Sequence, residues 1–181
     1  LALVTKESSR RIEIDTAPSA ADIRHIWAQI ETDPLRPMLL ADTTTFLSSR
    51  HFLAAVGNTI LPFVAFVDGD PVALAWLYNI AMAPPKMTAL SAWLAFYALA
   101  QFRGSQIWLQ GKDAFLASVR TYGLEHLWAE VRLDNLASQY VLRVSGFTHV
   151  ATVPSWKRYQ GQWHDMQLYH LPLAPIVDLP P

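Results

Sequence analysis

The segment between residues 89 and 131 constrains the fold more than any other part of the chain. It begins with the apolar run ALSAWLAFYALA (residues 89–100), which predicts a buried strand. A helical pattern follows over roughly Ser105–Tyr122, and Gly123 ends it, because glycine readily adopts the left-handed conformation found after helices. The next run, LEHLWAEV (residues 124–131), is apolar at both alternating sets of positions and predicts a strand covered on both sides. A strand, a helix and a strand in this order form a right-handed crossover between parallel strands.

The other strand patterns predict antiparallel neighbours for this unit. RRIEID (residues 10–15) alternates like a half-buried strand, and LPFVAFVDGDPVALAWLYNI predicts a hairpin that turns at Asp68-Gly69-Asp70. Near the C-terminus, FTHVATV and DMQLYHL predict two strands joined by the long aromatic loop PSWKRYQGQWH. The expected element order is βααβββαβαββ, which gives an α/β fold with a mixed, mostly antiparallel sheet around one central parallel crossover.

Three further helices complete the expected elements. Residues 17–32 form one with Ser19 as its N-cap, and its apolar stripe is Ile23, Ile26, Trp27 and Ile30. Residues 43–56 form a second helix. The third starts at Asp134 or Asn135, ends at Gly146 and has an apolar stripe of Leu136, Tyr140 and Val144.

Composition limits the classes of function. The 181 residues suit one domain (1–181), and 14 Lys plus Arg against 15 Asp plus Glu leave no basic surface for nucleic acid. The most apolar run is too short for a membrane helix, the N-terminus does not resemble a signal peptide, and the chain has no cysteine. These features predict a soluble cytoplasmic protein. Seven Trp, six Tyr and eight Phe also suit a homodimer that buries aromatic surface between subunits.

The spacing of residues between Arg103 and Phe147 resembles the GCN5-related N-acetyltransferase family. That family has a loop of the form Arg/Gln-x-x-Gly-x-Gly/Ala before a helix, and a glycine before the next strand. Arg103 and Gly123 match these positions, and WAEV matches the strand. The family's following segment, Val-x-x-x-Asn and then a helix ending in Gly-Phe, matches Val131, Asn135, Gly146 and Phe147.

The resemblance implies an acetyltransferase-like domain that transfers an acyl group from acetyl-CoA to an amine of a small molecule or peptide. It also implies a cofactor site, with backbone N–H groups at a helix N-terminus facing the pyrophosphate. The residues it places there are Arg103, Gly104, Ser105, Gln106, Trp108 and Asn135.

The loop departs from the family pattern in either of two registers. With Arg103 as the opener, Gln106 and Trp108 stand at the two small-residue positions. The alternative register, Gln101-x-x-Gly104-x-Gln106, recovers one glycine but leaves the helix two residues too long before Gly123, so we prefer the first. Helical periodicity offers a second interpretation of Trp108, in which it packs in the core beside Phe115. Asn135 likewise suits either the cofactor or a plain helix cap.

The catalytic groups are less defined. Leu142 stands where family members often place a tyrosine that protonates the departing thiolate, and Tyr140, two residues earlier, is expected to face elsewhere. Glu130 and His126 share one face of the strand at residues 124–131 and are the candidates for a general base. The alternative function is a catalytically inactive binding or assembly protein on the same scaffold.

Other chemistries receive less support from the sequence. The six histidines show no metal-binding spacing, so no metal site is expected. A hydrolase elbow and a Walker loop are also missing from the sequence. The predicted loop at residues 155–164 mixes Trp, Tyr, Lys and Arg, and we expect it to help shape the acceptor site.

Overall fold

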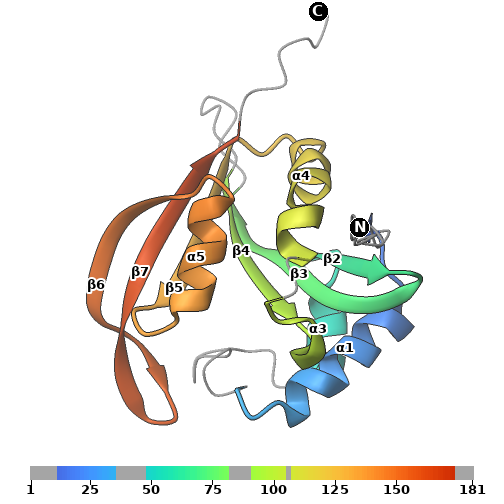
Figure 1. Ribbon diagram of the computed structural model, residues 1–181, viewed down its shortest axis with the longest axis horizontal. Helices are drawn as coiled ribbons and strands as arrows, with labels where there is room; N and C mark the ends of the chain where they lie inside the picture. The colour runs from blue at the N-terminus through green and yellow to red at the C-terminus, as the bar shows by residue number, and fades with distance from the viewer. Residues whose placement is uncertain (1–11, 36–47, 82–90, 105–106, 174–181) are drawn as a thin grey trace, which may run out of the picture.

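The computed structural model describes residues 12–35, 48–81, 91–104 and 107–173 (Figure 1). The elements in chain order are β1 (Ile12–Asp15), α1 (Ala20–Thr32), α3 (Ser49–Ala55), β2 (Ile60–Val67), β3 (Asp70–Ala81), β4 (Ser91–Ala98), a short 3-10 helix (Ala100–Phe102), α4 (Ile107–Arg120), β5 (His126–Arg132), α5 (Leu136–Val144), β6 (Thr148–Tyr159) and β7 (Gln162–Pro172). The expected order βααβββαβαββ is confirmed over these residues. The first part of the helix expected at residues 43–56 lies outside them.

The strands form one seven-stranded sheet in the order β1-β2-β3-β4-β5-β7-β6. Only the β4–β5 pair is parallel, and the other five neighbouring pairs are antiparallel. The predicted mixed sheet with a central parallel crossover is therefore confirmed. None of the helices that the structure describes is long and apolar enough to cross a membrane.

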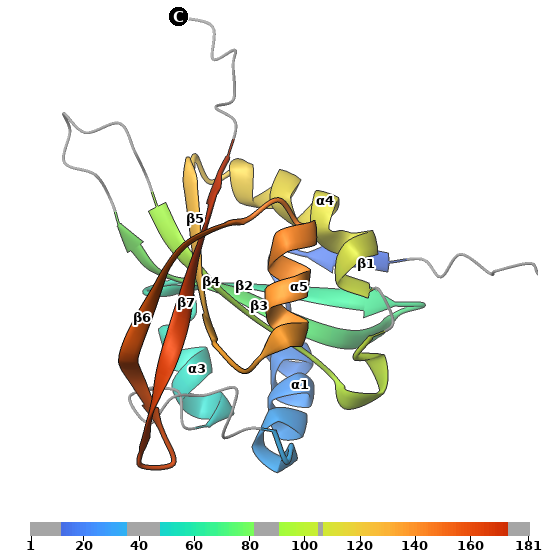
Figure 2. The ribbon, with the colours of Figure 1, turned by 60° about the vertical axis from the view of Figure 1, so that its left-hand side comes forward.

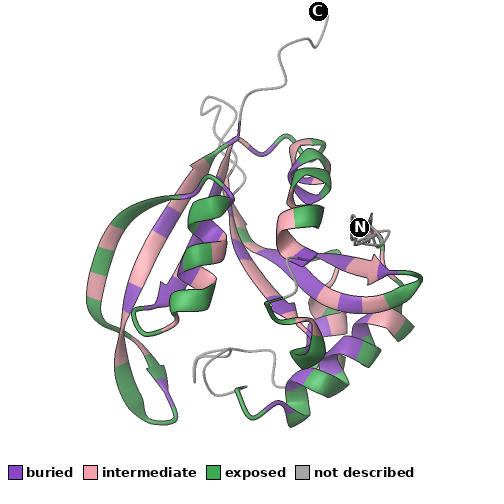
Figure 3. Cartoon of the chain, viewed as in Figure 1, coloured by how far each residue is buried: buried purple, intermediate pink, exposed green. Residues whose placement is uncertain are grey.

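Helices cover the two faces of the sheet in separate pairs (Figure 1, Figure 2). On one face, Phe115 and Val119 of α4 and Leu142 of α5 pack against Leu127 and other residues of β5. On the opposite face, α1 and α3 pack against β2, β3 and β4, and here the predicted stripe of α1 is fully buried: Ile23, Ile26, Trp27 and Ile30. Figure 3 shows the buried residues concentrated along these contacts.

The first hairpin and the cap of α1 agree with the prediction. Asp68 and Gly69 turn the chain between β2 and β3 with φ angles of 53° and 93°, values that suit a tight two-residue turn. The Ser19 side chain accepts a hydrogen bond from the N–H of Asp22, and so caps α1.

The prediction of a long loop at PSWKRYQGQWH (residues 154–164) is wrong, because β6 and β7 extend through most of this segment. Their turn is confined to Gln160 and Gly161, whose φ angles are 48° and 77°. A shift in the β6–β7 register between Val153 and Lys157 accommodates Pro154 within β6. The aromatic residues on either side of the turn then pair as strand residues, which suits their β propensity.

The predicted apolar stripe of α5 is also wrong. Leu136, Tyr140 and Val144 are 68%, 55% and 39% exposed. The helix instead buries Leu142 and the polar Gln139. The Gln139 side-chain amide donates to the carbonyls of Arg132 and Leu133, at 3.3 and 2.8 Å, so its burial leaves no polar atom unpaired there.

Candidate active site

Strands β4 and β5 part from each other halfway along their length. They pair only at Ser91–His126, Ala92–Leu127 and Trp93–Trp128, although β4 continues to Ala98 and β5 to Arg132. Their outer neighbours, β3 and β7, stay paired with them beyond this point. Figure 1 shows the resulting divergence, with β4 and β5 running apart below the paired ends. The two adjacent strands at the centre of the sheet therefore lose their backbone pairing beyond Trp93 and Trp128.

Glu130 lies where the two strands diverge, two residues beyond the last β4–β5 pair. Its Oε1 accepts a hydrogen bond from the Tyr78 hydroxyl of β3 at 3.2 Å, and its Oε2 accepts one from the Trp156 indole of β6 at 3.2 Å. The Lys157 ammonium forms an ion pair with the same carboxylate. Only 11% of the Glu130 side chain is exposed. Three donors from two distant strands thus hold one half-buried carboxylate in place.

This carboxylate affects the ionisation of nearby phenols. Burial raises the pKa of the Tyr78 hydroxyl well above its usual value, and the charge and hydrogen bond of Glu130 raise it further. Burial, followed by the charge of Glu130, also raises the pKa of Tyr159 to about 12. Both phenols remain protonated at neutral pH, so Tyr78 acts as a donor that orients Glu130.

An irregular stretch of β6 places Trp156 and Lys157 beside Glu130. Ser155 adopts a left-handed conformation with φ of 49°, within the register shift between Val153 and Lys157. The Ser155 N–H donates to the side chain of Asp165 on β7 at 2.9 Å, which fixes the distortion. Because the sequence pattern predicted a loop here, it did not indicate that Trp156 and Lys157 contact Glu130.

The other two catalytic candidates lie away from this carboxylate. His126 occupies the same face of β5, but Glu130 lies four positions further along the strand, a distance of about 13 Å. Its Nδ1 lies 2.9 Å from Nε2 of His170, and burial, then the proximity of His126, lowers the pKa of His170. Tyr140 lies on the exposed side of α5 while Leu142 is buried, so the two residues face different directions, as predicted.

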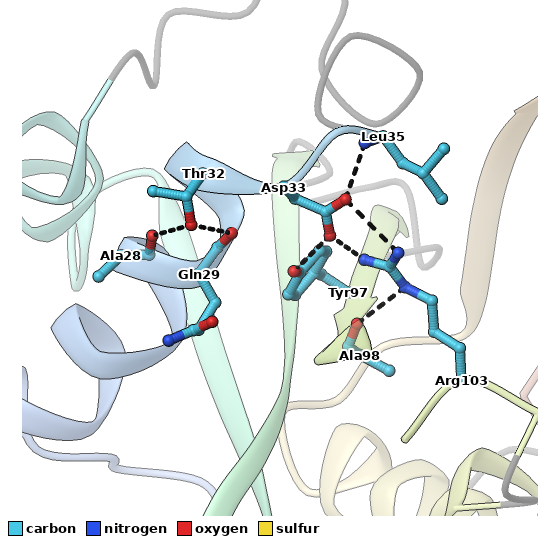
Figure 4. A network of polar contacts seen from close by, with 8 residues as sticks. All are labelled: Ala28, Gln29, Thr32, Asp33, Leu35, Tyr97, Ala98 and Arg103. Carbon is cyan, nitrogen blue, oxygen red and sulfur yellow. Dashed lines mark hydrogen bonds and ion pairs between the residues drawn. The ribbon is translucent and has the colours of Figure 1, made fainter. Parts of the chain in front are cut away.

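Arg103 of the predicted cofactor loop takes part in a network that the sequence did not indicate (Figure 4). Its guanidinium forms an ion pair with Asp33, which follows the last residue of α1, and its Nε donates to the Ala98 carbonyl at 3.3 Å. The Tyr97 hydroxyl and the Leu35 N–H each donate to the Asp33 carboxylate at 2.7 Å. Arg103 therefore ties the segment before α4 to the end of α1.

The Asp33 carboxylate is held in its charged form. Burial acts to raise its pKa, but the hydrogen bonds from Arg103, Tyr97 and the Leu35 backbone together lower the pKa below the usual 3.8. Burial, followed by the hydrogen bond and charge of Asp33, raises the pKa of Tyr97 to about 12. The network thus joins a charged carboxylate, a guanidinium and a protonated phenol.

Gly104 of the predicted cofactor loop lies just before α4. Gly104 has φ of +76°, and a Cβ placed there would meet no heavy atom within 4 Å. The helix begins at Ile107, directly after Gln106. The residues between Gly104 and Ile107 belong to both registers, so the choice between them stays a prediction. Ser105 and Gln106 themselves lie outside the described residues.

Trp108 is half-buried and packs against the core beside Phe115, as one of its two interpretations predicted. Its ring lies 4.9 Å from Phe96 of β4 and 5.3 Å from Phe115, measured between ring centroids. Its indole N–H donates to the Ser145 hydroxyl at 2.6 Å. Ser145 follows α5, so Trp108 connects the first turn of α4 with the end of α5.

Asn135 caps α5. Its side-chain oxygen accepts a hydrogen bond from the Ser138 N–H at 3.1 Å, in the geometry expected of an N-cap. The structure therefore confirms the interpretation of Asn135 as a helix cap. Its predicted contact with a cofactor stays a prediction.

The same fold occurs in solved structures of acetyltransferases. RimL, the ribosomal L7/L12 alpha-N-protein acetyltransferase in complex with coenzyme A, is 16% identical, with a TM-score of 0.73 over 90% of this chain and 94% of that chain. The putative acetyltransferase yncA from Salmonella typhimurium, solved with acetyl-CoA, is 18% identical, with a TM-score of 0.72 over 92% of this chain and 99% of that chain. A putative acetyltransferase from Acinetobacter baylyi is 16% identical, with a TM-score of 0.75 over 96% and 98%. No protein-family model matches the sequence, and neither does any curated protein. The chain therefore resembles the GCN5-related N-acetyltransferases in its whole fold as well as in the spacing between Arg103 and Phe147.

Proposed function

We propose that the protein is an N-acyltransferase that transfers the acetyl group of acetyl-CoA to an amine, with Glu130 as the proton acceptor. The observation that carries the proposal is the position of this carboxylate at the divergence of β4 and β5. A reaction between a thioester and an amine needs a gap for the acyl arm and a base beside the attacking nitrogen. Among the described residues, the divergence of β4 and β5 places the half-buried carboxylate of Glu130 beside two separated strands.

The backbone before α4 fits the pyrophosphate of a coenzyme A. Gly104 adopts a left-handed turn in open space, and the N–H groups of the first turn of α4 follow it. Side chains at Gln106 or Trp108 do not remove these N–H groups. Arg103 holds the turn through Asp33, while Ser105, Gln106, Trp108 and Asn135 are proposed to lie beside the bound cofactor.

Bound acetyl-CoA would supply the activated acyl group, and the residues around Glu130 handle the proton. Glu130 accepts a proton from the acceptor ammonium, directly or through one water. Tyr78 and Trp156 orient its two oxygens, and an incoming ammonium replaces Lys157 as the cationic partner. Leu142 has no proton to give, so the departing thiolate is protonated by solvent. The acceptor is an amine of a small molecule or a peptide.

A non-catalytic binding or assembly role on this scaffold is the second candidate, and Trp108 favours it. The Trp108 ring links α4, β4 and α5 and occupies space between the two helices on the predicted cofactor side. In this second function the ring closes the site instead of lining it.

Titration calorimetry with acetyl-CoA separates the two functions, and a thermal-shift measurement checks the result. Ligand at 100 times its dissociation constant adds about 2.7 kcal/mol of stability, roughly a 5–10 °C shift. Binding of acetyl-CoA but not of adenosine, followed by thiol release with an amine panel, supports the transferase. No heat and no shift at millimolar acetyl-CoA would exclude it.

The role of Glu130 is tested with Glu130→Gln. We expect a loss of about 100-fold or more in the rate of thiol release with little change in acetyl-CoA affinity, because the amide cannot accept the proton. Glu125→Gln, the same substitution at the residue before β5, serves as the control and should keep the wild-type rate. An unchanged rate in Glu130→Gln would show that another group takes the proton.

A further inference from the structure

We propose that Lys157 is an internal acceptor, and that the protein acetylates its own Lys157 when acetyl-CoA is supplied. This inference rests on the proposed transferase function. The Lys157 ammonium is ion-paired with the carboxylate that we assign as the base, and this carboxylate lies where β4 and β5 diverge. A primary amine of the chain therefore already occupies the position that an acceptor ammonium would take.

The environment of Lys157 differs from that of the other lysine that the structure describes, Lys112. The two side chains are almost equally exposed, at 27% for Lys157 and 25% for Lys112, and each forms an ion pair. The partner of Lys112 is Asp113, whose side chain is 82% exposed, whereas the Glu130 side chain is only 11% exposed. Solvent exposure of the amine thus does not separate the two lysines, but the placement of the carboxylate does.

The backbone of β6, in addition to the ion pair, keeps the Lys157 side chain beside Glu130. The left-handed Ser155 and its hydrogen bond to Asp165 fix the strand two residues before Lys157. The indole of Trp156 contacts the same carboxylate as Lys157, through its second oxygen. Two consecutive residues of β6 thereby converge on Glu130, which restricts the amine to the vicinity of this one carboxylate.

The chemical step follows from this contact. The Lys157 ammonium first passes a proton to Glu130, and from there the proton reaches water. The neutral nitrogen then bonds to the acetyl carbonyl carbon while the carbon–sulfur bond breaks. The amide nitrogen loses a second proton, and the departing thiolate takes one up, so the reaction releases one proton overall and involves no change in oxidation state.

Acetylation of Lys157 would also change the site for the next acceptor. The amide carries no charge, so Glu130 loses its cationic partner and keeps the hydrogen bonds from Tyr78 and Trp156. A carboxylate without a neighbouring cation binds a proton more readily and attracts an external ammonium. Self-acetylation would therefore free the base for an external amine.

The experiment incubates the purified protein with acetyl-CoA and measures acetylation of each lysine by peptide mass spectrometry over time. Lys112 reports the rate of uncatalysed acetylation within the same molecule. We expect Lys157 to be acetylated at least about 100-fold faster than Lys112, a typical contribution of a positioned base. In Glu130→Gln, Lys157 should be acetylated only as fast as Lys112. In Lys157→Arg, the intact protein should gain no acetyl group over the time in which wild-type Lys157 is acetylated.

Acetyl-CoA binding, measured by calorimetry on the wild type and on Lys157→Arg, separates failure of this proposal from failure of the transferase. If acetyl-CoA binds but Lys157 reacts no faster than Lys112, or reacts equally fast in Glu130→Gln, self-acetylation is overturned and the transferase proposal stands. If acetyl-CoA does not bind, both are overturned. The comparison of Lys157 with Lys112 uses the wild-type protein, so it does not depend on the folding of a variant.

Discussion

Replacing Asp33 by Asn tests whether the network around Arg103 stabilises the fold. Only 3% of the Asp33 side chain is exposed, and breaking a buried ion pair by removing one partner costs about 3–5 kcal/mol. Arg103 is 31% exposed and keeps part of its hydration, while fully exposed pairs contribute about 0–1 kcal/mol. The Asn amide also still accepts a hydrogen bond from Tyr97. We therefore expect Asp33→Asn to lower the free energy of unfolding by about 2–3 kcal/mol, between these two limits.

Urea denaturation, with a thermal scan as a second probe, measures this loss. A loss of 2–3 kcal/mol corresponds to a fall of roughly 5–10 °C in Tm for a domain of this size. The control is Asp113→Asn, the same substitution at a carboxylate that is 82% exposed and paired with Lys112, which should cost under about 0.5 kcal/mol. If the two variants lose the same free energy, the network does not stabilise the fold and the reasoning is refuted.

The stability difference between the wild type and Asp33→Asn should depend on pH with a defined sign. The pKa of Asp33 is lowered from 3.8 in the folded protein. The charged Asp33 therefore stabilises the fold fully above pH 3.8, and this stabilisation is lost as the pH falls below that value. The difference in unfolding free energy between the wild type and Asp33→Asn should stay constant above about pH 5 and shrink below about pH 4. A difference that grows on acidification would contradict the assigned direction of the shift.

Three substitutions on α4 and α5 test the other assignments. Asn135→Ala should cost about 1 kcal/mol of unfolding free energy in urea, because the Ser138 N–H loses its cap. Trp108→Ala should cost about 2–3 kcal/mol in the same assay, less than a fully buried tryptophan because the ring is only half-buried. Tyr140→Phe should leave the rate of thiol release unchanged, since its side chain is 55% exposed, and a large loss would show that its hydroxyl reaches the reaction.

The elements that were predicted correctly are those that local sequence determines. The stripe of α1 repeats at helical spacing and starts from a serine cap, and both features act within a few residues. The turn at Asp68-Gly69 is similarly local, because these two residue types tolerate the positive φ angles of a tight hairpin. The parallel crossover followed from the order of strand, helix and strand alone.

The errors arose where a contact outside the helix or strand pattern decided the outcome. In α5, the buried face contains Gln139, whose amide is satisfied by carbonyls of the preceding segment. A pattern that counts only apolar residues selects the opposite face, with Leu136 and Tyr140. In β6, Pro154 and the basic residues suggested a loop, because the sequence does not show the register shift that accommodates the proline.

Most of the candidate site could not have been found from sequence, because its members meet only in the folded chain. Glu130 was identified as a candidate from its strand position. Its partners Tyr78 and Lys157, however, lie 52 and 27 residues away along the chain. Asp33 and Arg103 are 70 residues apart. No periodicity or motif connects such positions, whereas the sheet order brings them together.

The predicted cofactor loop keeps a single glycine, Gly104, in the turn that we propose binds phosphate. Glycine lets a backbone approach an anion, but it also leaves the turn conformationally free before binding. Here the turn at Gly104 directly follows Arg103, which is fixed by the buried Asp33 and by the carbonyl of Ala98. A side-chain clamp of this kind reduces the entropy lost on binding, and the N–H groups of the first turn of α4 do not depend on the side chains at Gln106 or Trp108. If the turn binds acetyl-CoA, Asp33→Asn should therefore weaken binding at a temperature where the variant is still folded. An unchanged affinity in calorimetry would mean that the clamp serves only the stability of the fold.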